Sequence, residues 1–306
     1  MSTRSRGRSC RVNSELHLNL LERTDRLYGI REALRRVISP SSRVLDAGCG
    51  SGLLSIWAAQ LGAMDVIGVD SDSVDVAQEL AIANGVRANV RFVSADLFNE
   101  SSSELIGDRN VIVAMLFLND PRRDERQIEI ILSLRKRHLT ASGVMIPSRV
   151  VTRGRLLEWP DQDYQSWLIR TQERTHRLSN LYGVDLSPLH RSIAAGTWHS
   201  QFPARNWTGR YPGAGYEIRT EAVEAYTVDL HRGEFNPPSQ VVATATSRGA
   251  ANTLLWVQEI WFEDILLFSN ESISWLEHSV WCEPGQPVEM KLGKSWRDRN
   301  VIELGG

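Results

Sequence analysis

The sequence predicts a doubly wound α/β domain followed by a β-rich domain, and a change of pattern near residue 150 separates the two. Before that point, short apolar runs alternate with helix-like segments, as in parallel sheets with crossover helices. After Pro147 the segments read as strands separated by Gly, Pro and Asn turns. We therefore expect one domain over residues 29–149, after a tail and helix over 1–28, and a second over 150–306.

In the first domain, we expect strands over residues 43–48, 65–70, 90–96, 110–117 and 140–147. Between the last two strands, Ile128, Ile131, Leu132 and Arg135 recur at helical spacing. This segment ends in basic residues, which the helix dipole favours at a C-terminus. In the second domain, we expect strands over residues 224–230, 239–247, 253–262 and 274–282, interrupted by a polar helical stretch over about 161–191.

The composition is that of an ordinary globular protein and argues against several partners. The 306 residues are 42% hydrophobic and carry a net charge of -2, so no basic field is present to hold a nucleic acid. The three cysteines form no CxxC pair, and the histidines form no HxxxH or HxH pair, so we expect no metal site. No apolar run reaches the length of a membrane span, and we expect a cytoplasmic protein.

The glycine-rich stretch "VLDAGCGSG" follows the first strand. Gly48, Gly50 and Gly52 let the backbone approach a ligand at the carboxyl end of the sheet. Asp70 ends the next strand, where a carboxylate suits ribose hydroxyls. A dinucleotide would fit this pattern, but the spacing is GxGxG, and Asp46 would bring a carboxylate to the loop that receives a pyrophosphate.

A cationic ligand suits Asp46 better. Asp96, which ends the third strand, could accept a hydrogen bond from the amino group of an adenine. Cys49 and Ser71 adjoin these positions and complete the candidate set. The alternative is a plain βα turn in which the acidic residues cap helices.

These residues resemble class I S-adenosylmethionine methyltransferases, and other motifs resemble one branch of them, the protein arginine methyltransferases. "HLNLLERTDR" is similar to that family's N-terminal helix. The resemblance implies that His17 contacts the ribose and that Arg26 pairs with the carboxylate of the cofactor. "YGVDLSPL" is similar to the family's dimerisation arm, and "ISWLEHSVWC" to the strand that carries its Thr-His-Trp signature. The implied fold is a Rossmann-like domain followed by a β-barrel domain with a helical arm, in a homodimer.

The acceptor loop departs from the family. Two glutamates nine positions apart grip the target guanidinium in these enzymes, and counting back from "TASGVMIP" places them at Glu125 and Leu116. Asp120 and Asp124 are alternative carboxylates if the loop is shifted. The signature is altered as well, with Ser274 at the place of its histidine, before Trp275. One glutamate thus becomes a leucine, which weakens the grip on a guanidinium.

Three functions remain from this comparison. The first is methylation of a small molecule at nitrogen, with Glu125 orienting the acceptor against the apolar wall of Leu116; Asp120 and Ser274 are further catalytic candidates, and Trp275 would line the acceptor. The second is methylation of arginine, in a protein or as the free amino acid. The third is binding of S-adenosylmethionine without turnover.

Overall fold

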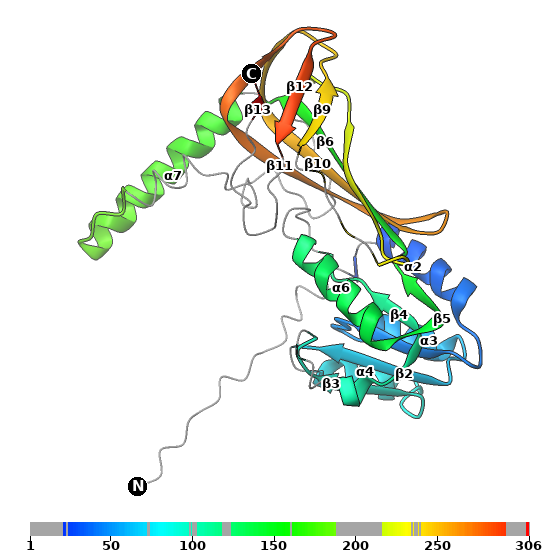
Figure 1. Cartoon of the computed structure of the whole chain (residues 1–306). Coiled ribbons are helices and arrows are strands. Elements are labelled where there is room, and N and C mark those ends of the chain that lie inside the picture. The colour runs from blue at the N-terminus through cyan, green and yellow to red at the C-terminus, as the bar shows by residue number, and fades with distance from the viewer. Residues whose placement is uncertain are drawn as a thin grey trace.

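The computed structural model describes residues 21–22, 24–71, 74–97, 99, 103–117, 124–159, 161–187, 216–233, 235, 238, 240–291 and 304–305. Within these ranges, only the backbone is described at 103, 124–126, 161–168, 171, 272–275, 277–278, 291 and 304–305. Two main sheets are visible, a parallel one and a curled antiparallel one (Figure 1). Among the described helices, none is both long enough and apolar enough to span a bilayer.

The first sheet is parallel, with strand order β3-β2-β1-β4-β5. The strands are β1 (Arg43–Ala47), β2 (Asp65–Asp70), β3 (Val90–Ser94), β4 (Arg109–Ala114) and β5 (Leu139–Ile146). The helices that accompany them are α2 (Thr24–Val37), α3 (Leu53–Gln60), α4 (Asp75–Ala83), α5 (Ser103–Ile106) and α6 (Asp124–His138). The strand order reverses between β1 and β4, and ligands of such sheets bind beyond the carboxyl ends at this switch point.

The remaining strands are antiparallel. The curled sheet has the order β11-β10-β6-β7, and β8 also pairs with β6. Its strands are β6 (Arg149–Glu158), β7 (Glu217–Ile218), β8 (Val223–Asp229), β10 (Gly249–Phe262) and β11 (Ile265–Cys282). A small sheet pairs β9 (Gln240–Thr244), β12 (Pro287–Lys291) and β13 (Leu304–Gly305). The doubly wound class is thus confirmed, as are all five strands and the helix expected in the first domain.

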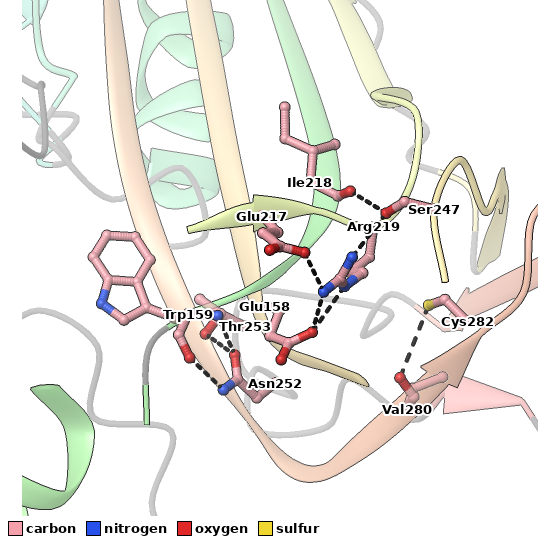
Figure 2. Close-up of polar contacts among 10 residues, drawn as sticks. All are labelled: Glu158, Trp159, Glu217, Ile218, Arg219, Ser247, Asn252, Thr253, Val280 and Cys282. Atoms are coloured by element: carbon pink, nitrogen blue, oxygen red, sulfur yellow. Dashed lines mark hydrogen bonds and ion pairs between the residues drawn. The ribbon is translucent and has the colours of Figure 1, made fainter. Parts of the chain in front are cut away.

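Between β6 and β7, helix α7 (Asp161–Tyr182) extends away from both sheets (Figure 1). Its root is held by polar contacts, shown in Figure 2. Arg219 donates to Glu158 at 2.9 Å and pairs with Glu217 at 2.5 Å. Asn252 bonds the backbone nitrogen and oxygen of Trp159, each at 2.8 Å. The ion pairs of Arg219 hold the ends of β6 and β7 together, and Asn252 on β10 holds the backbone of Trp159. The chain therefore leaves the sheet toward α7 from a defined position.

The two sheets meet at α2, which packs against β11. Gly29 lies so close to this strand that a Cβ atom there would be 2.8 Å from the carbonyl oxygen of Leu267. Ile30 and Leu34, on the same helix, belong to the buried core. Only a glycine permits this approach, so α2 joins the parallel sheet to the curled sheet at a fixed distance.

Gly29→Ala tests this packing. Alanine favours an isolated helix by about 1 kcal/mol over glycine, so a gain is expected if the site is open. Because the added methyl meets backbone rather than a flexible side chain, we expect a net loss of about 1 to 3 kcal/mol in the free energy of unfolding. Urea unfolding measures it. Tyr28→Ala, a neighbouring residue that is 77% exposed, is the control and should change stability little. A stabilised Gly29→Ala protein would contradict the packing.

Candidate functional site

The candidate site lies at the carboxyl ends of β1, β2 and β4. The loop after β1 turns through Gly48 and Gly52, whose φ angles are 72° and 78°. The backbone nitrogens of Gly48 and Cys49 donate to the carbonyl of Val69 at 2.8 and 3.1 Å, which fastens the loop to β2. Positive φ values suit glycine because it has no Cβ. The chain can therefore turn tightly here and leave its backbone close to whatever lies above the switch point.

Asp70 holds the same loop from the end of β2. Its Oδ2 accepts a hydrogen bond from the backbone nitrogen of Gly50 at 2.8 Å. The backbone nitrogen of Ala95 donates to the Asp70 carbonyl at 2.7 Å, which brings the end of β3 alongside. Ser71 and Asp96 are exposed at these strand ends. The structure thus gathers Gly50, Asp70, Ser71 and Asp96 at one edge, while their contacts with a cofactor stay a prediction.

Asp46 points to α3. Its carboxylate is 1% exposed, and its Oδ2 accepts hydrogen bonds from the backbone nitrogen of Ser55 at 3.0 Å and from the Ser55 hydroxyl at 2.6 Å. Burial raises the pKa of Asp46 to about 6, although the bonds from Ser55 oppose the shift. The contacts that the structure shows for Asp46 therefore fix the turn between β1 and α3, and a direct contact with a cation stays a prediction.

Cys49 is buried in the same turn. Burial, with the charges of Asp46 and Asp70, raises the pKa of its thiol far above the ordinary range. A thiolate is the nucleophilic form of cysteine, so this thiol is unreactive at neutral pH. Its predicted contact with the cofactor stays a prediction.

Arg26 connects three parts of the fold. It lies on α2, is 8% exposed, and donates to the carbonyl of Met115 at 3.2 Å. Its guanidinium carbon lies 4.4 Å from the centre of the Phe268 ring on β11, a cation–π contact. Met115 directly follows β4. The predicted cofactor-binding arginine therefore sits at the junction of the parallel sheet, the curled sheet and the segment that follows β4.

Leu116 lies directly on the glycine-rich loop. A Cβ atom built on Gly48 would be 2.3 Å from Cδ2 of Leu116, so the leucine side chain occupies the space that a larger residue at position 48 would need. Leu116 is partly buried, and the next residue, Phe117, is fully buried. The segment after β4 thus brings the side chain of Leu116 onto the loop that follows β1.

The other predicted residues lie partly or wholly outside the described part. His17 and Asp120 are not described. Glu125 is the second residue of α6, and Ser274 and Trp275 pair with Leu254 and Thr253 in the sheet, with only their backbones described. Their roles stay predictions.

Three contributors were not predicted from the sequence: Ser55, the carbonyl of Met115, and Phe268. No motif marks them, because Met115 and Phe268 act through contacts between distant segments and the contact of Ser55 depends on how α3 packs against β1. A hydroxyl nine residues after the strand-ending aspartate is a weak local signal for Ser55 alone. Within the described residues, no group of three or more His, Cys, Asp or Glu side chains is arranged to hold a metal ion.

The raised pKa of Asp46 has a definite effect on stability. The folded state binds this proton more tightly than the unfolded chain, whose value is near 3.8. Its stabilising contribution is therefore complete below pH 3.8 and is lost as the pH rises through about 6. We expect Asp46→Asn, whose amide oxygen can still accept from Ser55, to gain on the order of 3 kcal/mol relative to the wild type across this window.

Urea unfolding between pH 4 and 7 measures the difference. Asp264→Asn is the control, because Arg36 lowers the pKa of this exposed carboxyl and no gain is expected over the same range. Parallel curves for Asp46→Asn and the wild type would show that the carboxyl is not perturbed.

Comparisons with known proteins agree with this geometry. The family model described as Ribosomal protein L11 methyltransferase (PrmA) matches residues 29–146. Protein arginine N-methyltransferase 1 of Dictyostelium discoideum is 29% identical over 182 residues, covering 58% of this chain and 50% of that protein. Arginine N(omega)-methyltransferase of Streptomyces achromogenes subsp. streptozoticus is 25% identical over 293 residues, covering 91% of this chain and 73% of that protein. The chain thus spans half the length of the Dictyostelium relative.

Solved structures show the same fold. The Trypanosoma brucei PRMT1 enzyme-prozyme heterotetrameric complex with AdoHcy matches with a TM-score of 0.65 and 21% identity, covering 91% of this chain and 88% of that one. Arabidopsis thaliana protein arginine methyltransferase 10 matches with a TM-score of 0.64 and 19% identity, covering 90% and 86%. In sequence and in fold, the chain resembles the class I S-adenosylmethionine methyltransferases of the arginine methyltransferase type.

Proposed function

We propose that this chain is an S-adenosylmethionine-dependent methyltransferase that methylates a nitrogen of a small molecule. The contact of Leu116 with Gly48 carries the proposal. Leu116 corresponds by resemblance to the family's first glutamate. Its apolar side chain lies beside the loop that we expect to receive the cofactor. A pocket with one apolar wall suits an acceptor whose polar group is confined to one side.

The residues present fit the cofactor. Arg26 supplies a buried cation for a carboxylate, and its planar fork suits two parallel hydrogen bonds. Asp70 supplies a carboxylate at the end of β2 for ribose hydroxyls, and the loop at Gly48 and Gly50 offers its backbone. Bound S-adenosylmethionine supplies an electrophilic methyl group on a sulfonium. The chain must then hold an acceptor nitrogen in line, at about 3 to 3.5 Å from that carbon, and exclude water.

The acceptor nitrogen must be neutral when it attacks, because its lone pair forms the new N–C bond while the S–C pair stays on sulfur. The nitrogen then loses a proton. Glu125, at the start of α6, is the candidate to orient the acceptor or accept this proton. A protonated amine and a guanidinium each carry one positive charge, which one carboxylate can balance, but the planar fork of the guanidinium gains most from two carboxylates.

Arginine methylation is the second candidate. The observation that favours it is the similarity over 91% of this chain to the Streptomyces protein named Arginine N(omega)-methyltransferase. Retention of Glu125 is compatible with it. Binding of the cofactor without turnover is the third possibility, and cofactor affinity alone does not distinguish the three.

Mass spectrometry after incubation with S-adenosylmethionine tests the proposal. Free L-arginine, an Arg/Gly-rich peptide and a panel of amines and amino acids are offered separately. We expect a gain of one methyl mass on a small amine, with less on arginine and none on the peptide. A gain confined to arginine or the peptide would support the second candidate. No gain on any acceptor, with cofactor binding confirmed in the same sample, would support binding without turnover.

Leu116→Glu tests the acceptor side directly. If a guanidinium can enter beside Gly48, a second carboxylate should raise kcat/KM for arginine by about ten- to a hundredfold, as a charge-assisted hydrogen bond predicts. Leu116→Gln is the matched control, because it has the shape of glutamate without the charge and should give little gain. Equal rates for both variants on arginine would show that the guanidinium does not reach this position.

We also propose a homodimer formed through α7. Ile169, Leu181, Tyr182 and Val184 expose apolar side chains on this helix and just beyond its end, each more than half exposed. Leu181, Tyr182 and Val184 lie within four residues of one another, and apolar side chains that are exposed together favour association. Sedimentation of the purified chain should give twice its mass of 34.5 kDa. The pair Leu181→Asp and Val184→Asp should give the monomer, while Leu266→Asp, an exposed apolar residue on β11, should not. A wild-type monomer would exclude the dimer.

A further inference from the structure

A row of buried polar side chains crosses three strands of the curled sheet. Gln258 on β10 pairs in register with Thr152 on β6 and with Asn270 on β11. All three are at most 1% exposed. Residues directly opposite one another on neighbouring strands project from the same face, so these side chains are neighbours. Figure 1 shows β6, β10 and β11 side by side in this sheet.

Several polar atoms of this row have no hydrogen-bond partner among the described residues. They are Oε1 and Nε2 of Gln258 and Oγ1 of Thr152. Trp256 is two residues before Gln258 on the same face, is 4% exposed, and its Nε1 also lacks a described partner. Buried polar groups in folded proteins are almost always paired, with protein or with a bound molecule. An unpaired primary amide, hydroxyl and indole on one buried face therefore indicate a missing partner.

The chemistry of these atoms defines that partner. The amide of Gln258 and the hydroxyl of Thr152 can each donate and accept, and the indole of Trp256 donates. None of the three carries a formal charge, so an ion would gain no counter-charge from them. The surrounding side chains on this face, such as Ile260 and Phe268, belong to the apolar core.

We propose that Gln258, Thr152 and Trp256 form a binding site inside the curled sheet for a small neutral molecule that both donates and accepts hydrogen bonds. Water is the smallest such molecule, and a small alcohol or amide has the same chemistry. The guanidinium of Arg26 lies over the ring of Phe268. Phe268 is two residues from Asn270 on β11, which places it about 7 Å from Asn270 along the strand. The site therefore adjoins the junction of the two sheets. The inference does not depend on the methyltransferase activity.

Thr152→Val and Gln258→Met test the site through the sign of their effect. If a molecule is bound, each substitution removes a hydrogen bond, and the apparent unfolding midpoint should fall by about 2 °C or more at a fixed scan rate. If nothing is bound, each removes an unpaired buried polar group, and the midpoint should rise.

Thr253→Val is the matched control. This buried threonine is on β10 as well, and its Oγ1 is paired with Asn252 at 2.9 Å, so the midpoint should fall whatever the interior holds. A rise for Thr152→Val and Gln258→Met, beside a fall for Thr253→Val, would overturn the proposal.

A crystal structure of the full chain provides the second measurement. We expect electron density within hydrogen-bond distance of the Gln258 amide, and an empty interior there would overturn the proposal even if a variant failed to fold. Mass spectrometry of the small molecules released on denaturation then distinguishes the two sources. An organic compound in stoichiometric amount identifies a ligand, and its absence, with density present, identifies water.

Discussion

The candidate site depends on how closely the side chain of Leu116 approaches the backbone of Gly48. Two loops, one after β1 and one after β4, meet at the point where the strand order of the parallel sheet reverses. A glycine at position 48 makes the meeting possible, because any Cβ there would overlap the leucine. The same contact would bring the acceptor next to the cofactor. A single steric constraint thus links the loop after β1 to the segment after β4.

Arg26 extends this arrangement to the rest of the fold. Its side chain contacts the carbonyl of Met115 and the ring of Phe268, so the helix before the parallel sheet, the segment after β4 and the curled sheet converge on one cation. A buried guanidinium needs partners that compensate for its lost hydration. The carbonyl of Met115 and the ring of Phe268 are two of these partners.

The sequence was sufficient for much of the fold because the relevant signals are local. Apolar runs that end at Asp46 and Asp70 predicted β1 and β2, and helical spacing from Ile128 to Arg135 predicted α6. The glycines of the turn were also identifiable, since their conformation is a property of the chain itself. Strands β6 and β12 were not singled out, because β6 follows Pro147 without an alternating pattern and β12 is short.

Other features of the site could not be predicted from spacing. That Gly29 lies against Leu267 and that Gln258 faces Thr152 depend on segments that are distant in sequence or on the register of paired strands. That Ser55 bonds Asp46 depends on the packing of α3 against β1. Ser55 is a partner of Asp46 that was not predicted from the sequence. Asp46 is buried because α3 packs against the end of β1, and the pattern of residues in the sequence does not predict this packing.

The most direct test of the account is a crystal structure of the chain with S-adenosylhomocysteine. We expect the ligand to lie along Gly48 and Gly50, with its carboxylate on Arg26 and its sulfur in van der Waals contact with the side chain of Leu116. A ligand bound elsewhere, or one whose sulfur is separated from Leu116 by another side chain, would contradict the claim that this leucine forms the boundary between cofactor and acceptor.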